Sequence, residues 1–307
     1  MRTHRRASST DTAESRVNDH AGRRGYAYIP FPWVRSPIID SLRAAGHKPL
    51  MYALLQVDVT EPRRSLDAYA RATGETFSFT AYIISCIARA IAEHPMIQAY
   101  RVGRRRLILF DDVDVCTPIE RKLSGGDDWS GGHDASGEKQ ATPYVIRAAN
   151  HKSLRQLHQE IRAAQRAGLG GAWAERVRRL YPHMPRALRM AFWRAFHRSP
   201  RLKRRIGGTV NVTAVGMFGK GAAWGISPVS DYTTLIVIGS IAEQPGVVDG
   251  RIEIRQYLCL TIATDHDVVD GAPMARFAQR LRELIESGYG LAEAGVTGAA
   301  SPTMTTS

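Results

Sequence analysis

The chain has 307 residues, 44% of them hydrophobic, which is enough for a sizeable core in one large domain or two small ones. It carries no run of 18 apolar residues and no signal-like N-terminus, so we expect a cytoplasmic protein without a membrane-spanning helix. The net charge is +13, and residues 171–206 contribute +10 of it, from eleven Arg or Lys and one acid, so the basicity belongs to one segment.

The polar residues 1–25 predict a disordered arm, because they hold few large apolar side chains. Residues 36–45 predict a helix that Gly46 ends, and residues 52–60 predict a strand. Two further helices are expected over 66–73 and 82–93, and the second is so apolar that we place it at the centre of the fold.

Strand-forming stretches follow within residues 105–116 and at 144–146. Between them, residues 122–141 hold five glycines and few apolar side chains, which indicates a flexible surface loop. A helix is expected over 153–166.

The C-terminal part predicts three strands, over 209–215, 234–241 and 256–264. A last helix spans 272–287, and the small residues of 288–307 indicate a flexible tail. Because strands and helices interleave, the sequence favours an α/β or α+β fold. The three cysteines, Cys86, Cys116 and Cys259, show no CxxC spacing, so we expect small buried side chains and no metal site.

His266 stands where the last predicted strand meets the last helix, a junction that places side chains at the rim of a sheet. An imidazole is suited to taking a proton near neutral pH. Asp270 and Gly271 follow at a turn, which indicates a fixed local geometry. By itself this short string is weak support for catalysis.

Five blocks in the same order over about 240 residues carry a stronger signal. They are Lys48-Pro49 with residues 56–60, the helix that ends at Pro95, residues 142–150, residues 208–219 and the His266 motif. In these blocks the chain resembles the catalytic domain of the dihydrolipoamide acyltransferases of 2-oxo acid dehydrogenase complexes, within the chloramphenicol acetyltransferase-like superfamily.

The resemblance implies a mixed β-sheet flanked by helices, with a catalytic domain over 26–287 and a coenzyme A-dependent acyl transfer. His266 matches the base that deprotonates a thiol, and Thr213 matches the hydroxyl that donates a hydrogen bond to the oxyanion. Asp270 matches a carboxylate that holds the site together, often through an arginine. The resemblance also implies a homotrimer in which His266 and Thr213 of adjacent subunits meet.

The chain departs from the family in two respects. Asp267 stands where an arginine usually follows the histidine, and an acid beside the imidazole is expected to favour its charged form. The first 25 residues are also too few for the lipoyl and peripheral-subunit-binding domains of the relatives. We therefore expect a stand-alone catalytic domain, to which another protein would supply any lipoyl group.

The basic segment 171–206 forms an insertion relative to the family and includes a predicted amphipathic helix over 185–198. Three interpretations remain open: a packed helical hairpin with a solvated basic face, a surface that binds an anionic membrane or an acidic partner, and a clamp for the phosphates of coenzyme A. No nucleic-acid-binding motif accompanies the charge.

Two functions of different classes follow. One is the acyltransferase with His266, Thr213 and Asp270 at its site. The other is a catalytically degenerate homologue that binds a membrane or a partner through residues 171–206. The three intact side chains favour the enzyme.

Overall fold

The computed structural model describes residues 35–46, 48–122, 139–166, 180–216 and 221–296. The predicted arm over residues 1–25 lies outside these ranges. So do most of the predicted loop over 122–141 and the first part of the basic segment.

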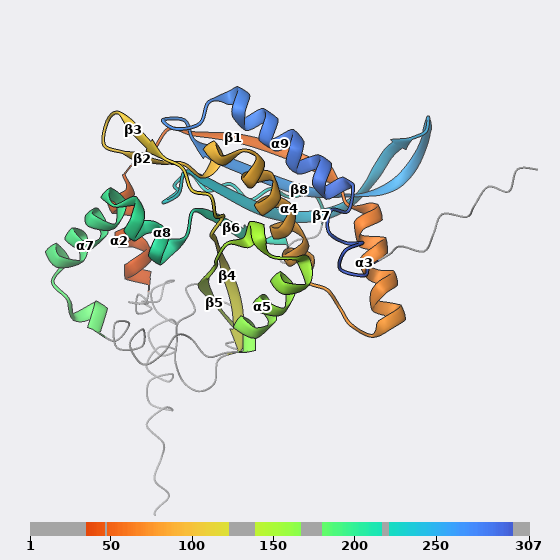
Figure 1. The fold of residues 1–307 in the computed structure, drawn as a ribbon, viewed down its shortest axis with the longest axis horizontal. Helices are drawn as coiled ribbons and strands as arrows, with labels where there is room; N and C mark the ends of the chain where they lie inside the picture. Colours follow the sequence, from red (N-terminus) through yellow and green to blue (C-terminus); the bar gives the residue numbers. More distant parts are fainter. Residues whose placement is uncertain (1–34, 47, 123–138, 167–179, 217–220, 297–307) are drawn as a thin grey trace, which may run out of the picture.

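A six-stranded mixed sheet forms the frame of the molecule, in the order β1-β8-β7-β6-β4-β5 (Figure 1). Among the described strands, only the pairs β4–β6 and β6–β7 are parallel. The strands are β1 (Leu50–Asp58), β4 (Val115–Lys122), β5 (Lys139–Ile146), β6 (Val210–Ala214), β7 (Thr234–Val248) and β8 (Arg251–Asp265). A separate two-stranded ribbon pairs β2 (Tyr100–Val102) with β3 (Arg106–Ile108).

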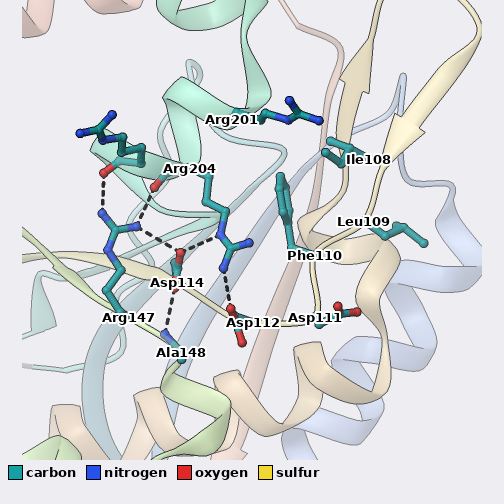
Figure 2. A pocket seen from close by; sticks show the side chains of 11 residues that line it. Ile108, Leu109, Phe110, Asp111, Asp112, Asp114, Arg147, Ala148, Arg201 and Arg204 are labelled. Atoms are coloured by element: carbon teal, nitrogen blue, oxygen red, sulfur yellow. Dashed lines mark hydrogen bonds and ion pairs between the residues drawn. The ribbon is translucent and has the colours of Figure 1, made fainter.

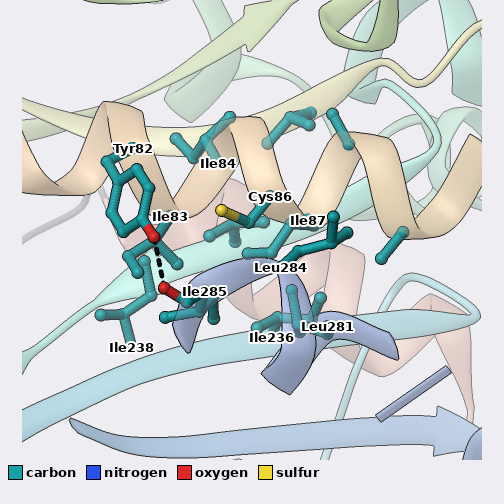
Figure 3. Packing of buried hydrophobic residues seen from close by; sticks show 14 of the residues in the cluster. Tyr82, Ile83, Ile84, Cys86, Ile87, Ile236, Ile238, Leu281, Leu284 and Ile285 are labelled. Carbon is teal, nitrogen blue, oxygen red and sulfur yellow. Dashed lines mark hydrogen bonds between the residues drawn. The ribbon is translucent and has the colours of Figure 1, made fainter. Parts of the chain in front are cut away.

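Helices α4 (Phe79–Glu93) and α9 (Gly271–Glu286) lie together against the sheet (Figure 1). Ser78 begins α4 by accepting a hydrogen bond from the Ala81 N–H at 3.3 Å. The Tyr82 hydroxyl donates to the Ile285 carbonyl, which joins the two helices inside an otherwise apolar core (Figure 3). The predicted central helix is thus confirmed, and it begins three residues earlier than expected.

The other helices surround this core or lie at one end of it. They are α2 (Ser36–Ala45), α3 (Thr60–Thr73), α5 (Leu154–Arg166), α7 (Arg186–Arg198) and α8 (Pro200–Gly207). The predicted bounds of α2 are confirmed, and those of α7 within one residue. The sequence did not predict α8. The three cysteines are buried with free thiols, as expected of small core side chains.

Several predicted boundaries are wrong. Helix α3 begins at Thr60, six residues before its predicted start, so residue 60 does not belong to the preceding strand. Strand pairing between β4 and β5 continues to Lys122 and Lys139, so residues 122 and 139–141 belong to a ladder and not to a loop. The predicted tail over 288–307 is not loose where it is described. Leu291 and Val296 are 4% and 2% exposed in the main core, because Gly288 and Gly290 adopt positive φ and turn the chain back onto it.

Strands β7 and β8 are much longer than predicted and continue as a hairpin that projects from the body of the molecule (Figure 1). Its turn is Asp249-Gly250, both with positive φ, a pair typical of tight hairpins. One face of the hairpin is apolar: Val247, Ile252 and Ile254 are 77%, 78% and 72% exposed.

Candidate functional site

The turn that carries His266 begins directly at the end of β8. The His266 N–H donates to the Pro49 carbonyl at 2.8 Å, and the N–H groups of Val268 and Val269 both donate to the Asp265 carbonyl at 3.0 Å. These bonds fix the backbone from two sides, while the imidazole remains 51% exposed at the rim of the sheet. The geometry therefore presents His266 to an incoming molecule.

An ion pair that is largely buried holds the start of this turn in place. The Asp265 carboxylate is nearly buried, and the Lys48 Nζ lies 3.3 Å from its Oδ2 atom. The same Nζ donates to the Tyr232 carbonyl at 3.1 Å, and Asp265 Oδ1 accepts the Asp267 N–H at 3.1 Å. Sequence reasoning missed Asp265 as a positioning residue, although it directly precedes the histidine and Lys48 lies in the first resembling block.

Asp270 faces the imidazole without forming a hydrogen bond. Its Oδ1 atom is 3.9 Å from His266 Nδ1, beyond hydrogen-bond length, and its side chain is 82% exposed. This orientation directs Nδ1 toward the carboxylate and leaves Nε2 to face a substrate. No described arginine forms an ion pair with Asp270, so the arginine partner implied by the resemblance is not found in this part of the chain.

Asp267, at the position where the family usually has arginine, forms an ion pair of its own. Its Oδ2 atom lies 2.9 Å from Arg101 Nη1 on β2, and both side chains are about half-exposed. Part of the negative charge beside His266 is therefore offset by Arg101, which connects the ribbon β2–β3 to the turn that carries His266.

Thr213 lies half-buried on β6 and does not meet His266 within one chain. It pairs with Val237 on β7, which in turn pairs with Thr261 on β8. Thr213 is thus two strand spacings, about 10 Å, from β8, and His266 is five residues, about 17 Å, farther along that strand. A separation of about 20 Å is too large for one substrate carbonyl to contact both side chains.

An ion-pair cluster joins the basic segment to the sheet (Figure 2). Asp114 is buried, and it accepts from Arg147 at 3.1 Å, from Arg204 at 3.0 Å and from the Ala148 N–H at 2.8 Å. Arg204 also donates to Asp112 at 2.6 Å. Two of the guanidinium groups that line the adjoining cleft of about 690 Å³ are therefore already paired with carboxylates. This argues against a clamp for the phosphates of coenzyme A at this cleft.

The described part of the chain contains no group of three His, Cys, Asp or Glu side chains arranged to hold a metal ion. None of its helices is both long and apolar enough to cross a bilayer.

Comparison with known proteins supports the resemblance. Residues 194–292 match the family model of the catalytic domain of 2-oxoacid dehydrogenases acyltransferase. The lipoamide acyltransferase component of the branched-chain alpha-keto acid dehydrogenase complex of Bacillus subtilis is 23% identical over 274 residues, which cover 87% of this chain and 54% of that protein. Over residues 194–292 the chain is therefore similar to the catalytic domain of the 2-oxoacid dehydrogenase acyltransferases.

Two solved structures of such acyltransferases share the fold. A probable dihydrolipoamide acetyltransferase from Listeria monocytogenes superposes with a TM-score of 0.60 at 20% identity, covering 87% of this chain and 96% of that one. The Azotobacter vinelandii dihydrolipoamide acetyltransferase gives 0.57 at 19% identity, covering 87% and 94%. That study addressed the role of a serine, a histidine and an asparagine in catalysis, the asparagine four positions after the histidine.

The predicted fold class, a mixed sheet flanked by helices, is therefore confirmed. The chain spans about half the length of the Bacillus subtilis acyltransferase component.

Proposed function

We propose that the protein is an acyltransferase that moves an acyl group between coenzyme A and a thiol acceptor, with His266 as the general base. The observation that carries this proposal is the presentation of His266. Its backbone is fixed by Pro49 and Asp265, and its imidazole stays accessible with Nδ1 turned toward Asp270. In the Azotobacter acetyltransferase, a histidine and an asparagine at the same spacing of four were investigated for their roles in the catalytic mechanism.

The reaction follows from these groups. The acceptor thiol gives its proton to His266 Nε2, and the resulting thiolate attacks the carbonyl carbon of the acyl thioester. The carbon–sulfur bond to coenzyme A breaks as the tetrahedral intermediate collapses, and the coenzyme A thiolate recovers the proton from the imidazolium. Free thiols are mostly protonated at neutral pH, so the base makes the nucleophile available.

Thr213 is the proposed donor to the oxyanion of the intermediate. A hydroxyl in this role contributes roughly 3 kcal/mol to lowering the barrier. Because Thr213 and His266 of one chain lie about 20 Å apart, we propose that the two side chains come from adjacent copies of a homotrimer. Another protein would supply a lipoyl group if the acceptor is a lipoyl thiol.

The exposed hairpin face supports self-association. Pro245, Val247, Ile252 and Ile254 lie on one side of a two-stranded ribbon, and such ribbons are marginally stable without cover. We propose that a neighbouring copy covers this face. Burial of three large aliphatic side chains would then stabilise the assembly that completes the site.

The test of the proposed activity is thiol release from a panel of acyl-CoAs in the presence of a dithiol acceptor. We expect His266→Ala to lower the rate by about 1000-fold, because general-base catalysis is lost. The change His183→Ala, at an exposed histidine outside the proposed site, is the matched control and should keep the parent's rate. A rate that survives His266→Ala would overturn the mechanism.

A further inference from the structure

Helix α7 is fixed in its orientation by one polar face. Its Arg189 Nε lies 3.3 Å from the buried Asp40 carboxylate of α2. Trp193 donates to the Tyr181 hydroxyl at 2.8 Å, and that hydroxyl donates to Asp40 at 2.9 Å. His197 Nε2 lies 3.1 Å from the Ser41 carbonyl. These contacts turn the opposite side of α7 to solvent.

The outward side of α7 is unexpectedly apolar. Leu188 and Phe192, four residues apart, are 54% and 41% exposed, and the small residues Ala191 and Ala195 between and beside them are exposed as well. The apolar residues of the predicted amphipathic helix thus divide between two faces, since Phe196 is buried. On α8, Ile206 is 48% exposed.

The segment that forms α7 and α8 is also strongly basic. The stretch 186–207 contains seven arginines and one lysine and no acid. Arg189 and Arg204 are paired with Asp40 and with Asp112 and Asp114. Five exposed arginines have no described carboxylate as a partner: Arg186, Arg194, Arg198, Arg201 and Arg205.

We propose that the α7–α8 surface, defined by Leu188, Phe192, Ile206 and these five arginines, binds an anionic lipid membrane. The helix lies parallel to the bilayer, with Leu188 and Phe192 at the level of the headgroups and the guanidinium groups against lipid phosphates. Arginine is suited to this role because its fork of donors matches phosphate oxygens. The protein is held peripherally, with the acyltransferase fold outside the bilayer.

The charge pattern favours a lipid surface over a second copy of this chain. In a symmetric pair, two strongly basic surfaces would face each other and repel. A surface that joins exposed large apolar side chains to unpaired arginines instead fits an interface that offers both anionic groups and hydrocarbon.

The test is sedimentation of the full chain with vesicles of phosphatidylcholine alone or mixed with phosphatidylglycerol. We expect binding only to the mixed vesicles, with a strong decrease at high salt. Leu188→Ser/Phe192→Ser should weaken binding by about tenfold or more, and Arg194→Gln/Arg198→Gln by about fivefold for each charge removed.

Matched variants elsewhere control for exposure and charge. Leu54→Ser/Ile226→Ser removes apolar side chains that are 52% and 58% exposed, and Arg71→Gln/Arg104→Gln removes two exposed arginines. Both should bind as the parent does, and all variants should keep the parent's thermal unfolding. Equal binding to neutral vesicles, undiminished binding by both α7 variants, or binding to an acidic protein or nucleic acid in place of vesicles would overturn the proposal.

Discussion

The two ends of β8 differ in how far the rest of the same chain buries and pairs their side chains. At the inner end, Asp265 is buried, paired with Lys48 and bonded to the turn that carries His266. At the outer end, Ile252 and Ile254 stand more than 70% exposed on a projecting ribbon. Under the proposed function, His266 is positioned within one chain, whereas the cover of the hairpin face and the oxyanion donor would both come from another copy.

The largest effect is expected from substitutions on the apolar hairpin face at the outer end of β8. Ile252→Asp/Ile254→Asp places two charges on the face that we assign to a neighbouring copy, and buried unpaired carboxylates are costly. We expect trimers to dissociate in light-scattering measurements and acyl transfer to fall by about 100-fold, because the oxyanion donor of the neighbour is lost.

The control for this variant is Arg251→Gln/Glu253→Gln, on the opposite, polar side of the same ribbon. It should leave mass and rate unchanged. A monomer in which the activity of Ile252→Asp/Ile254→Asp is intact would show that the site is complete in one chain.

Loss of the Asp265–Lys48 ion pair at the inner end of β8 should impair catalysis without dissociating the trimer. Asp265→Asn removes the charge that Lys48 neutralises and leaves that amine half-buried, at a cost of about 3 kcal/mol in the free energy of unfolding. Small displacements of a catalytic group are expensive, so we expect kcat to fall by about tenfold with KM nearly unchanged.

The conservative partner change Lys48→Arg keeps the ion pair and should retain most of the rate. If Asp265→Asn matches the parent in kcat, the ion pair is structural only and does not position His266.

A third prediction concerns the junction of the basic segment, which lies apart from both ends of β8. Asp114→Ala leaves Arg147, Arg204 and the Ala148 N–H without their shared acceptor. We expect a loss of about 3 kcal/mol in the free energy of unfolding, measured with denaturant. Asp111→Ala, an exposed neighbour, is the matched control and should cost less than about 0.5 kcal/mol.

A fourth prediction concerns the pH dependence of the free energy of unfolding. Burial, with a smaller contribution from nearby Lys48, lowers the pKa of Lys203 to about 7, while Asp231 and Asp265 oppose the shift. Its Nζ also lies 4.3 Å from the centre of the Tyr100 ring. Because the unfolded chain binds this proton more tightly than the folded one, stability should rise with pH from about 7 to about 10.

Lys203→Met should remove that rise, since the side chain then carries no charge to bury. Denaturant unfolding at several pH values compares the two proteins directly. A slope between pH 7 and 10 that persists in Lys203→Met would assign the effect to other groups.

The sequence predicted most of the strands and helices, though not α8, because apolar periodicity and caps are local signals. The extension of β7 and β8 into a projecting hairpin was missed, although Asp249-Gly250 is a clear turn signal. The exposure of its apolar face could not be predicted, because Val247, Ile252 and Ile254 have the same sequence pattern whether or not another element covers them. Thr213 and His266 were predicted from the resemblance. Asp265 and Arg101 were missed, because ion pairs between distant segments leave no periodic pattern.

The most direct test of the central claim mixes two inactive chains. His266→Ala and Thr213→Ala proteins are unfolded together, refolded in equal amounts and assayed for thiol release from acyl-CoA. If His266 acts with Thr213 of an adjacent copy, random assembly restores complete sites at about one quarter of the interfaces, and the rate recovers to about that fraction of the parent's. A mixture no more active than its two components measured separately would contradict the account.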